Sequence, residues 1–210
     1  MKNQISKEQI REVLNLRHTK PVQEKLDKAK VAIAGLGGLG SHVAFLLART
    51  GVGNLHLIDY DFVDLANLHR QQYRLEHIGK KKTEALKEQL KEINPYLKIK
   101  TDFQKIDVNN LEMLLCGDDI ICEAFDVPEE KAMLINGVME IYPEKPLVGA
   151  SGIAGYGRSN DIKTRKAMGQ FYLCGDEKTG IEQGMGLTAP RVAIGAAHQA
   201  NKIIEIILEE

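Results

Sequence analysis

The stretch VAIAGLGGLGSHVAFLLARTG, residues 31–51, decides how this chain folds. A short run of small and β-branched apolar residues leads directly into GLGGLG at 35–40, and a largely apolar segment follows. This order predicts a buried strand, a tight glycine turn and a helix whose N-terminus faces the turn. Backbone N–H groups at such a turn bind phosphate, so the stretch predicts a nucleotide-binding site.

The glycines of this turn have distinct expected roles. Gly35 permits the tight turn, Gly37 lets the backbone approach phosphate, and Gly40 allows the helix to pack closely on the strand. Asp59 ends the next predicted strand, where its carboxylate can accept hydrogen bonds from ribose hydroxyls. NAD and ATP both carry ribose and phosphates, so these residues leave open the choice between a redox cofactor and a phosphate donor. A glycine-rich turn that binds nothing is the remaining alternative.

Elsewhere the chain alternates between predicted strands and helices. Strands are expected at 31–34, 54–59, 98–103, 118–125 and 146–152. Helices are expected at 7–16, 22–29, 40–49, 80–93, 108–116, 128–142 and 189–210. Residues 61–79 and the glycine-rich part after residue 152 show no regular pattern. The alternation predicts an α/β, Rossmann-like fold with a mostly parallel sheet and helices on both faces.

The length and composition favour a single domain, 1–210. The 210 residues, of which 43% are hydrophobic, can bury one sizeable core. Within it we expect a helical N-terminal arm at 1–28 and a nucleotide-binding core at 29–155. Residues 156–210 would hold a crossover loop and the C-terminal helix.

Charge and cysteine content argue against several classes of protein. The net charge of −1 gives no support for binding nucleic acid or an anionic membrane. No apolar run approaches the roughly 20 residues that cross a bilayer, and residues 1–30 are too charged for a secretory signal. Cys116, Cys122 and Cys174 are too scattered for a disulfide framework or a structural zinc. We therefore expect a cytoplasmic protein without zinc.

Polar and basic residues gather in the region that follows Asp59. ANLHRQQ at 66–72 supplies Asn67, Arg70 and Gln71, and a lysine cluster ending at Lys82 opens the next helix. The helix dipole disfavours cations at that position, which invites a functional explanation. Such cations suit a triphosphate whose pyrophosphate must leave, and therefore favour ATP over NAD.

Asp126 follows the fourth predicted strand, at the edge of the sheet where ligands bind. A carboxylate close to a triphosphate is suited to holding Mg²⁺. The alternative is that Asp126 caps the helix that begins near Pro128, and the two roles are compatible.

The motifs GLGGLGS, GVGNLHLID, ANLHRQ, GKKK and AFD, in this order, resemble the ThiF/MoeB adenylyltransferases, the prokaryotic relatives of ubiquitin-activating enzymes. The resemblance implies adenylation of the C-terminal glycine carboxylate of a small ubiquitin-like sulfur carrier, with ATP and Mg²⁺. The short ThiF-type branch is the most similar, which implies a ThiS-like carrier ending in Gly-Gly and a place in thiamine (thiazole) biosynthesis. It also implies a two-fold homodimer.

The resemblance implies a role for each matching residue. Gly37 and Gly38 would bind phosphate and Asp59 the ribose. The ATP phosphates would be contacted by Asn67, Arg70 and Gln71. Lys82 would be the catalytic lysine, Asp126 the Mg²⁺ ligand, and Arg11 an arginine supplied to the partner's ATP. A solvated surface arginine is the alternative for Arg11. Lys82 and Asp126 are expected at the pocket surface, so their loss should cost little stability.

The chain also departs from the family pattern. Val127 stands where the family has Asn, and FYLC at 171–174 replaces the first Cys-x-x-Cys pair of a zinc site. The loop GDEKTGIEQGMG at 175–186 lacks the cysteine that some relatives bond to the carrier. Cys174 is either a nucleophile or, as we favour, a packed remnant. We place Cys116 and Cys122 in the core and give no histidine a role.

Three alternative functions remain open at this point. An NAD-dependent oxidoreductase would explain the glycines and Asp59 but not Arg70, Lys82 or Asp126. A partner-binding pseudoenzyme is suggested by Val127 and the missing loop cysteine. Adenylation of a different acceptor, such as a tRNA base or another protein's carboxylate, is the third.

Overall fold

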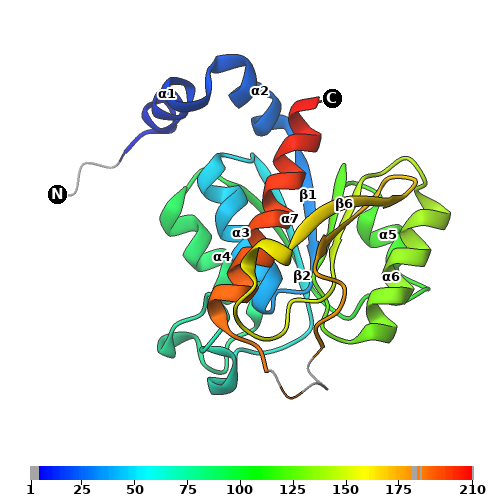
Figure 1. Cartoon of the computed structure of the whole chain (residues 1–210). Helices are drawn as coiled ribbons and strands as arrows, with labels where there is room; N and C mark the ends of the chain where they lie inside the picture. The colour runs from blue at the N-terminus through cyan, green and yellow to red at the C-terminus, as the bar shows by residue number, and fades with distance from the viewer. Residues whose placement is uncertain (1–4, 181–183, 185, 210) are drawn as a thin grey trace.

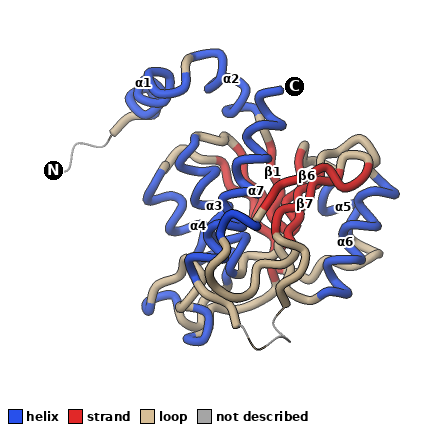
Figure 2. The backbone as a smooth tube through the Cα atoms, viewed as in Figure 1, coloured by secondary structure: helices blue, strands red, loops and turns tan. Residues whose placement is uncertain are grey.

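The computed structural model describes residues 5–180, 184 and 186–209. Within them a seven-stranded sheet runs in the order β3-β2-β1-β4-β5-β7-β6 (Figure 2). The strands are β1 (Lys30–Ala34), β2 (Asn54–Asp59), β3 (Lys98–Phe103), β4 (Ile120–Glu123), β5 (Leu147–Ala150), β6 (Lys163–Met168) and β7 (Phe171–Gly175). The helices are α1 (Lys7–His18), α2 (Lys20–Lys28), α3 (Gly38–Thr50), α4 (Lys82–Ile93), α5 (Leu111–Leu115), α6 (Pro128–Ile141) and α7 (Ala189–Glu209). The strands pair in parallel, except that β6 runs antiparallel to β7.

Helices cover both faces of this sheet. Helices α3, α4 and α7 lie on one face, and α5 and α6 lie on the other (Figure 1). Central strand β1 serves both layers, because Val31 and Ile33 belong to one hydrophobic cluster and Ala32 and Ala34 to the other. The predicted fold class is confirmed. Every helix in the described residues is too short or too polar to span a bilayer.

The boundaries of several helices differ from the predicted ones. Helix α3 begins at Gly38 and α4 at Lys82, while residue 210 of the last predicted helix lies outside the described residues. The helix predicted at 108–116 shrinks to Leu111–Leu115. Asp107 and Asn110 close a turn before it, since the Asp107 N–H donates to Asn110 Oδ1 at 2.9 Å and the Asn109 N–H donates to Asp107 Oδ1 at 2.8 Å.

Strands β6 and β7 are the elements that sequence reasoning missed. β6 is an edge strand of sequence KTRKAM whose side chains are mostly exposed. Edge strands rich in lysine and arginine lack the apolar alternation that marks a half-buried strand. The pairing of β7 with β5, Val148 opposite Tyr172, is a long-range contact that local sequence does not display.

Two side chains contradict what we expected of them. Cys116 is exposed rather than in the core, because α5 ends just before it. No histidine was given a role, yet His56 on β2 is buried with its two ring nitrogens 2.8 Å from Asp118 and 2.7 Å from Asp102. This cluster joins β2 and β3 to the turn before β4, so His56 is a structural residue.

Helices α1 and α2 form an N-terminal arm within the described residues. Ser6 and Gln9 form a capping box, with the Ser6 N–H donating to Gln9 Oε1 at 2.8 Å and the Gln9 N–H donating to Ser6 Oγ at 3.2 Å. Helix α2 buries Gln23 and Leu26, whereas none of the described residues of α1 is buried. In Figure 1 the arm therefore projects from the body beside the end of α7.

Candidate active site

A cavity of about 390 Å³ opens at the carboxyl ends of strands β1, β2, β4 and β5. Parallel sheets bind ligands at this edge, because loops and helix N-termini converge there. All but two of the predicted site residues line it, namely Gly35, Gly37, Gly38, Asp59, Asn67, Arg70, Gln71, Lys82 and Asp126. The exceptions are Gly40 and Arg11.

The glycine turn has the geometry that the sequence predicted. Gly35 has a φ of +91°, and a Cβ there would lie 2.8 Å from the carbonyl oxygen of Ala124. Gly40 packs beneath the turn, where a Cβ would overlap the carbonyl of Gly35. Gly38 begins α3 and leaves a Cβ only 2.9 Å from Val192. Larger residues would displace the turn and the N–H groups at the start of α3.

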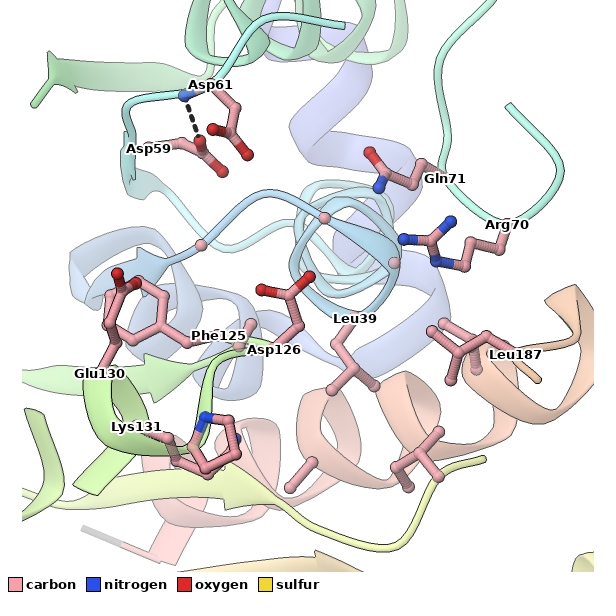
Figure 3. A pocket seen from close by; sticks show the side chains of 18 of the residues that line it. Leu39, Asp59, Asp61, Arg70, Gln71, Phe125, Asp126, Glu130, Lys131 and Leu187 are labelled. Carbon is pink, nitrogen blue, oxygen red and sulfur yellow. Dashed lines mark hydrogen bonds between the residues drawn. The ribbon is translucent and has the colours of Figure 1, made fainter. Parts of the chain in front are cut away.

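Asp59 is fixed against this turn. Its Oδ2 accepts a hydrogen bond from the Leu36 N–H at 2.6 Å, and its Oδ1 accepts one from the Asp61 N–H at 2.7 Å (Figure 3). Burial raises the pKa of Asp59, while the charge of Lys82 and the two N–H groups oppose that rise. The carboxylate thus sits rigidly where the turn meets β2.

Lys82, the first residue of α4, points into the same corner. Its Nζ lies 2.7 Å from Asp61 Oδ2 and 4.0 Å from Asp59 Oδ2. Lys82 lines the cavity but is only 5% exposed, so its ammonium group is buried against these carboxylates. Asp61 is a cavity residue that sequence reasoning missed, although its position two residues after Asp59 was a usable signal. The lysine balances two carboxylates, and its removal should therefore affect stability.

Arg70 and Gln71 face the cavity from the loop between β2 and α4 (Figure 3). Arg70 Nη1 donates to the Ala66 carbonyl at 3.3 Å, and no carboxylate among the described residues pairs with the guanidinium. Gln71 is buried, and its Oε1 lacks a partner within the described part of the chain. Buried polar atoms are normally satisfied, so Gln71 Oε1 is available to a ligand. The Arg70 guanidinium also contacts His69 Nε2 at 3.3 Å but faces no opposite charge among the described residues.

Asp126 lies near the centre of the view in Figure 3. Its carboxylate makes no hydrogen bond or ion pair with any described residue, and Val127 rather than Asp126 is the N-cap of α6. The alternative role as a helix cap is therefore wrong. Residues 5–180, 184 and 186–209 contain no cluster of three or more metal-ligating side chains. One carboxylate still fits Mg²⁺, which is usually held by one or two carboxylates together with substrate phosphates.

Part of the cavity lining is apolar, and polar side chains stand at its rim. Ile58, Ile106 and Phe125 supply this apolar part of the lining. Glu130 stands at the rim, held by Lys105 Nζ at 2.6 Å. Behind the wall, the fully buried Glu123 pairs with Lys131 Nζ at 2.5 Å. These residues carry no motif that separates them from ordinary helix and strand positions, so the sequence did not reveal them.

Arg11 lies far from this cavity. It pairs with Asp27 at 3.1 Å and lines a separate hollow beneath α1. The arm sits beside the amino ends of the central strands, at the opposite end of the molecule from the loop 61–79 (Figure 1). Arg11 therefore cannot reach the cavity of its own chain in this arrangement.

A sequence profile described as the ThiF family matches residues 7–210. The chain belongs to the ThiF family. The match includes α1, so the arm is part of the family's common sequence. It also extends to the C-terminal helix, which lines the cavity through Val192.

Among curated ThiF-type relatives, adenylyltransferase and sulfurtransferase UBA4 of Debaryomyces hansenii is 31% identical over 195 residues, which is 89% of this chain and 43% of that protein. Molybdopterin-synthase adenylyltransferase of Haemophilus influenzae is 40% identical over 113 residues, which is 53% of this chain and 46% of that protein. The chain thus spans less than half the length of either relative.

A solved structure with the same fold is tRNA N6-threonylcarbamoyladenosine dehydratase of E. coli in complex with ATP. Its TM-score is 0.87 over 98% of this chain and 97% of that chain, at 20% identity. This likeness concerns the fold alone. Because the alignment covers 98% of this ThiF-family chain, the likeness extends over β6 and β7.

In this ThiF-family chain Cys174 lies within the core on β7. Burial raises the pKa of its thiol to about 11, although the Thr164 hydroxyl 3.5 Å away opposes the rise. A thiol with so high a pKa is a poor nucleophile at neutral pH. Its surroundings favour the packed remnant over the nucleophile.

Proposed function

We propose that this protein adenylates the C-terminal glycine carboxylate of a small ubiquitin-like sulfur carrier, using ATP and Mg²⁺. The observation that carries the proposal is one cavity lined by the glycine turn, Asp59, Arg70, Lys82 and Asp126. Within the described part of the chain, no carboxylate pairs with Arg70 and no cation pairs with Asp126. NAD would use the glycine turn and Asp59 and leave the other three residues without a task. The carrier we propose is a ThiS-like protein that ends in Gly-Gly. The reaction would then belong to thiamine biosynthesis.

In the proposed reaction the carrier's carboxylate oxygen attacks the α-phosphorus of ATP. The new P–O bond forms as the bond to pyrophosphate breaks, which gives an acyl-adenylate and free pyrophosphate. The attacking carboxylate is already ionised at neutral pH, so no general base is required. Arg70 and Lys82 stabilise the charge that develops on the phosphates. Asp126 would hold Mg²⁺, which supplies further charge neutralisation on the phosphate oxygens.

We further propose that Arg11 acts on the ATP of a second copy of the chain in a homodimer. Its distance from its own cavity supports this assignment. Helix α1 also leaves Leu16 85% exposed and Val13 56% exposed. A symmetric partner would cover such apolar side chains, which a lone arm leaves in water.

The test is ATP–pyrophosphate exchange with a purified ThiS-like protein that ends in Gly-Gly. We expect exchange that requires the carrier and disappears when its terminal glycine is removed. A carrier that ends in another residue is the matched control. Absence of exchange with intact carrier, while ATP still binds, would favour the pseudoenzyme or a different acceptor.

Calorimetry separates the proposal from the oxidoreductase. We expect ATP to bind in the presence of Mg²⁺ and NAD not to compete, since the additional cations suit a triphosphate. Tight binding of NAD without binding of ATP would reject the adenylation mechanism.

A further inference from the structure

A buried ion pair lies beside the cavity and has no part in the mechanism above. Arg191, in the first turn of α7, is 3% exposed, and its Nη2 lies 2.5 Å from Asp176 Oδ2. Its Nη1 donates to the carbonyl of Gly157 at 2.7 Å. The arginine thus connects the start of α7 with the end of β7 and with the loop that follows β5.

Asp176 in turn holds the chain that leaves β7. Its Oδ1 accepts hydrogen bonds from the N–H groups of Lys178 and Thr179, both at 2.9 Å, and the Thr179 hydroxyl lies 3.0 Å from Oδ2. Gly152 faces the same carboxylate so closely that a Cβ there would overlap Oδ1. The carboxylate is therefore the point at which two loops are joined.

The charge of this pair persists at neutral pH. Burial alone would raise the pKa of Asp176, but the N–H groups of Thr179 and Lys178, the Thr179 hydroxyl and the charge of Arg191 together lower it. Both Asp176 oxygens and both terminal nitrogens of Arg191 are hydrogen-bonded, whereas Arg191 Nε has no partner among the described residues. A buried charged pair with so many bonds holds its surroundings in one arrangement. Removal of one partner leaves the other charge buried and uncompensated.

The segments held by the pair form one wall of the candidate active site. The 151–154 loop, Thr179, Gly180 and Leu187 line the cavity away from Asp59 and Lys82. Figure 3 shows Leu187 on the side opposite Asp59 and Asp61. A second cavity of about 800 Å³, lined by Asp176 and Arg191, shares Ala154 and Thr179 with the first. Ala154 and Thr179 thus border both cavities.

We propose that Arg191 and Asp176 are positioning residues for the acceptor, holding Thr179 and residues 152–157 as a fixed wall along which the acceptor's C-terminal segment enters. This inference rests on the proposed function, because it assigns the wall to the acceptor of that reaction. Asp59 and Lys82, which we assign to the nucleotide, make no hydrogen bond or ion pair with Arg191 or Asp176. Errors of about 1 Å in placing a reactant cost up to about a hundredfold in rate.

The variants are Arg191→Met, which removes the charge but keeps much of the bulk, and Asp176→Asn, which keeps an oxygen to accept from Thr179. The matched control is Arg165→Gln, because Arg165 pairs with the adjacent Glu177 at 2.5 Å but the pair is exposed. Calorimetry measures the Kd for ATP. Pyrophosphate exchange with the ThiS-like carrier measures its KM and kcat.

In Arg191→Met and Asp176→Asn we expect the KM for the carrier to rise about tenfold or more and kcat to fall, while the Kd for ATP stays within about twofold. Arg165→Gln should match the wild type. An unchanged carrier KM in both variants would overturn the inference while leaving the proposed function intact. Loss of ATP binding in both would also overturn it, since the pair would then support the whole fold. No exchange by the wild type, by contrast, would refute the proposed function itself.

Discussion

The glycine turn with Asp59 and Lys82, which we call the proposed nucleotide end of the cavity, differs from the N-terminal arm in how firmly it is packed. Around the glycine turn, Gly35 has no room for a side chain, and Asp59 is bound by two backbone N–H groups and faces Lys82. Helix α1 buries none of its described residues, and its Arg11 pairs with Asp27 of α2, within the arm itself. The glycine turn and Asp59 are therefore fixed by contacts within one chain, whereas α1 finds no buried surface among the described residues of its own chain.

The largest expected effect is that of Lys82→Ala, which breaks the nucleotide end. Exchange should fall on the order of a hundredfold or more, corresponding to about 3 kcal/mol of lost transition-state stabilisation. The sequence predicts little loss of stability, but the structure predicts that the free energy of unfolding falls by about 1–3 kcal/mol, because Asp59 loses the charge opposite it. Exchange assays and urea unfolding measure the two effects. Lys80→Ala is the control, since Lys80 pairs with Glu88 at the surface. Full activity in Lys82→Ala would reject its assignment.

Asp126→Ala should separate activity from stability at the same end. We expect exchange to fall about a hundredfold and to lose its dependence on Mg²⁺ concentration. The melting temperature should hardly change, because the carboxylate has no partner among the described residues. Glu129→Ala, on α6 but outside the cavity lining, is the matched control. A variant with normal Mg²⁺ dependence would show that Asp126 is not the ligand.

Mixing Arg11→Ala with Lys82→Ala tests whether the arm completes a partner's site. Each variant alone should be inactive as a homodimer. After subunit exchange about a quarter of the sites would carry both wild-type residues, so about a quarter of the activity should return. Arg17→Ala, on the same helix, should be active by itself. If demonstrable subunit exchange restores nothing, the arm does not act in trans.

A smaller effect is expected from a substitution of Cys174, which is buried on β7. Cys174→Ala should retain full exchange activity, because the thiol is buried and its pKa is raised to about 11. Its stability should fall by about 1 kcal/mol from the lost packing. Metal analysis of the wild type should find no zinc. Stoichiometric zinc, or loss of exchange in the variant, would contradict the assignment.

The smallest expected effect sharpens the description of the arm. Ser6→Ala removes the side chain that caps α1, which is worth about 1 kcal/mol to a helix. Because α1 buries nothing, amide exchange should accelerate about fivefold within α1, while global unfolding stays unchanged. Hydrogen exchange with mass spectrometry resolves the two. A lower global stability would mean that the arm is more firmly docked than its contacts indicate.

The amino-acid sequence by itself determined the fold class and most of the nucleotide end. The turn at 35–40 and Asp59 could be predicted because local geometry dictates them: a tight turn and a close helix–strand contact admit only glycine, and a strand end exposes its carboxylate. Arg70, Lys82 and Asp126 follow the carboxyl ends of predicted parallel strands, so their meeting in one cavity could also be predicted. Parallel strands bring their carboxyl ends to one edge.

The tertiary structure decided the properties that depend on residues distant in sequence. It buried Lys82 between two carboxylates, placed Arg191 against Asp176, and left Cys116 in solvent after α5. It also paired β7 with β5 and set β6 at the edge, where charged residues suit a strand that faces water. Burial and ion pairing are sums over neighbours from several segments, so no local pattern in the sequence encodes them.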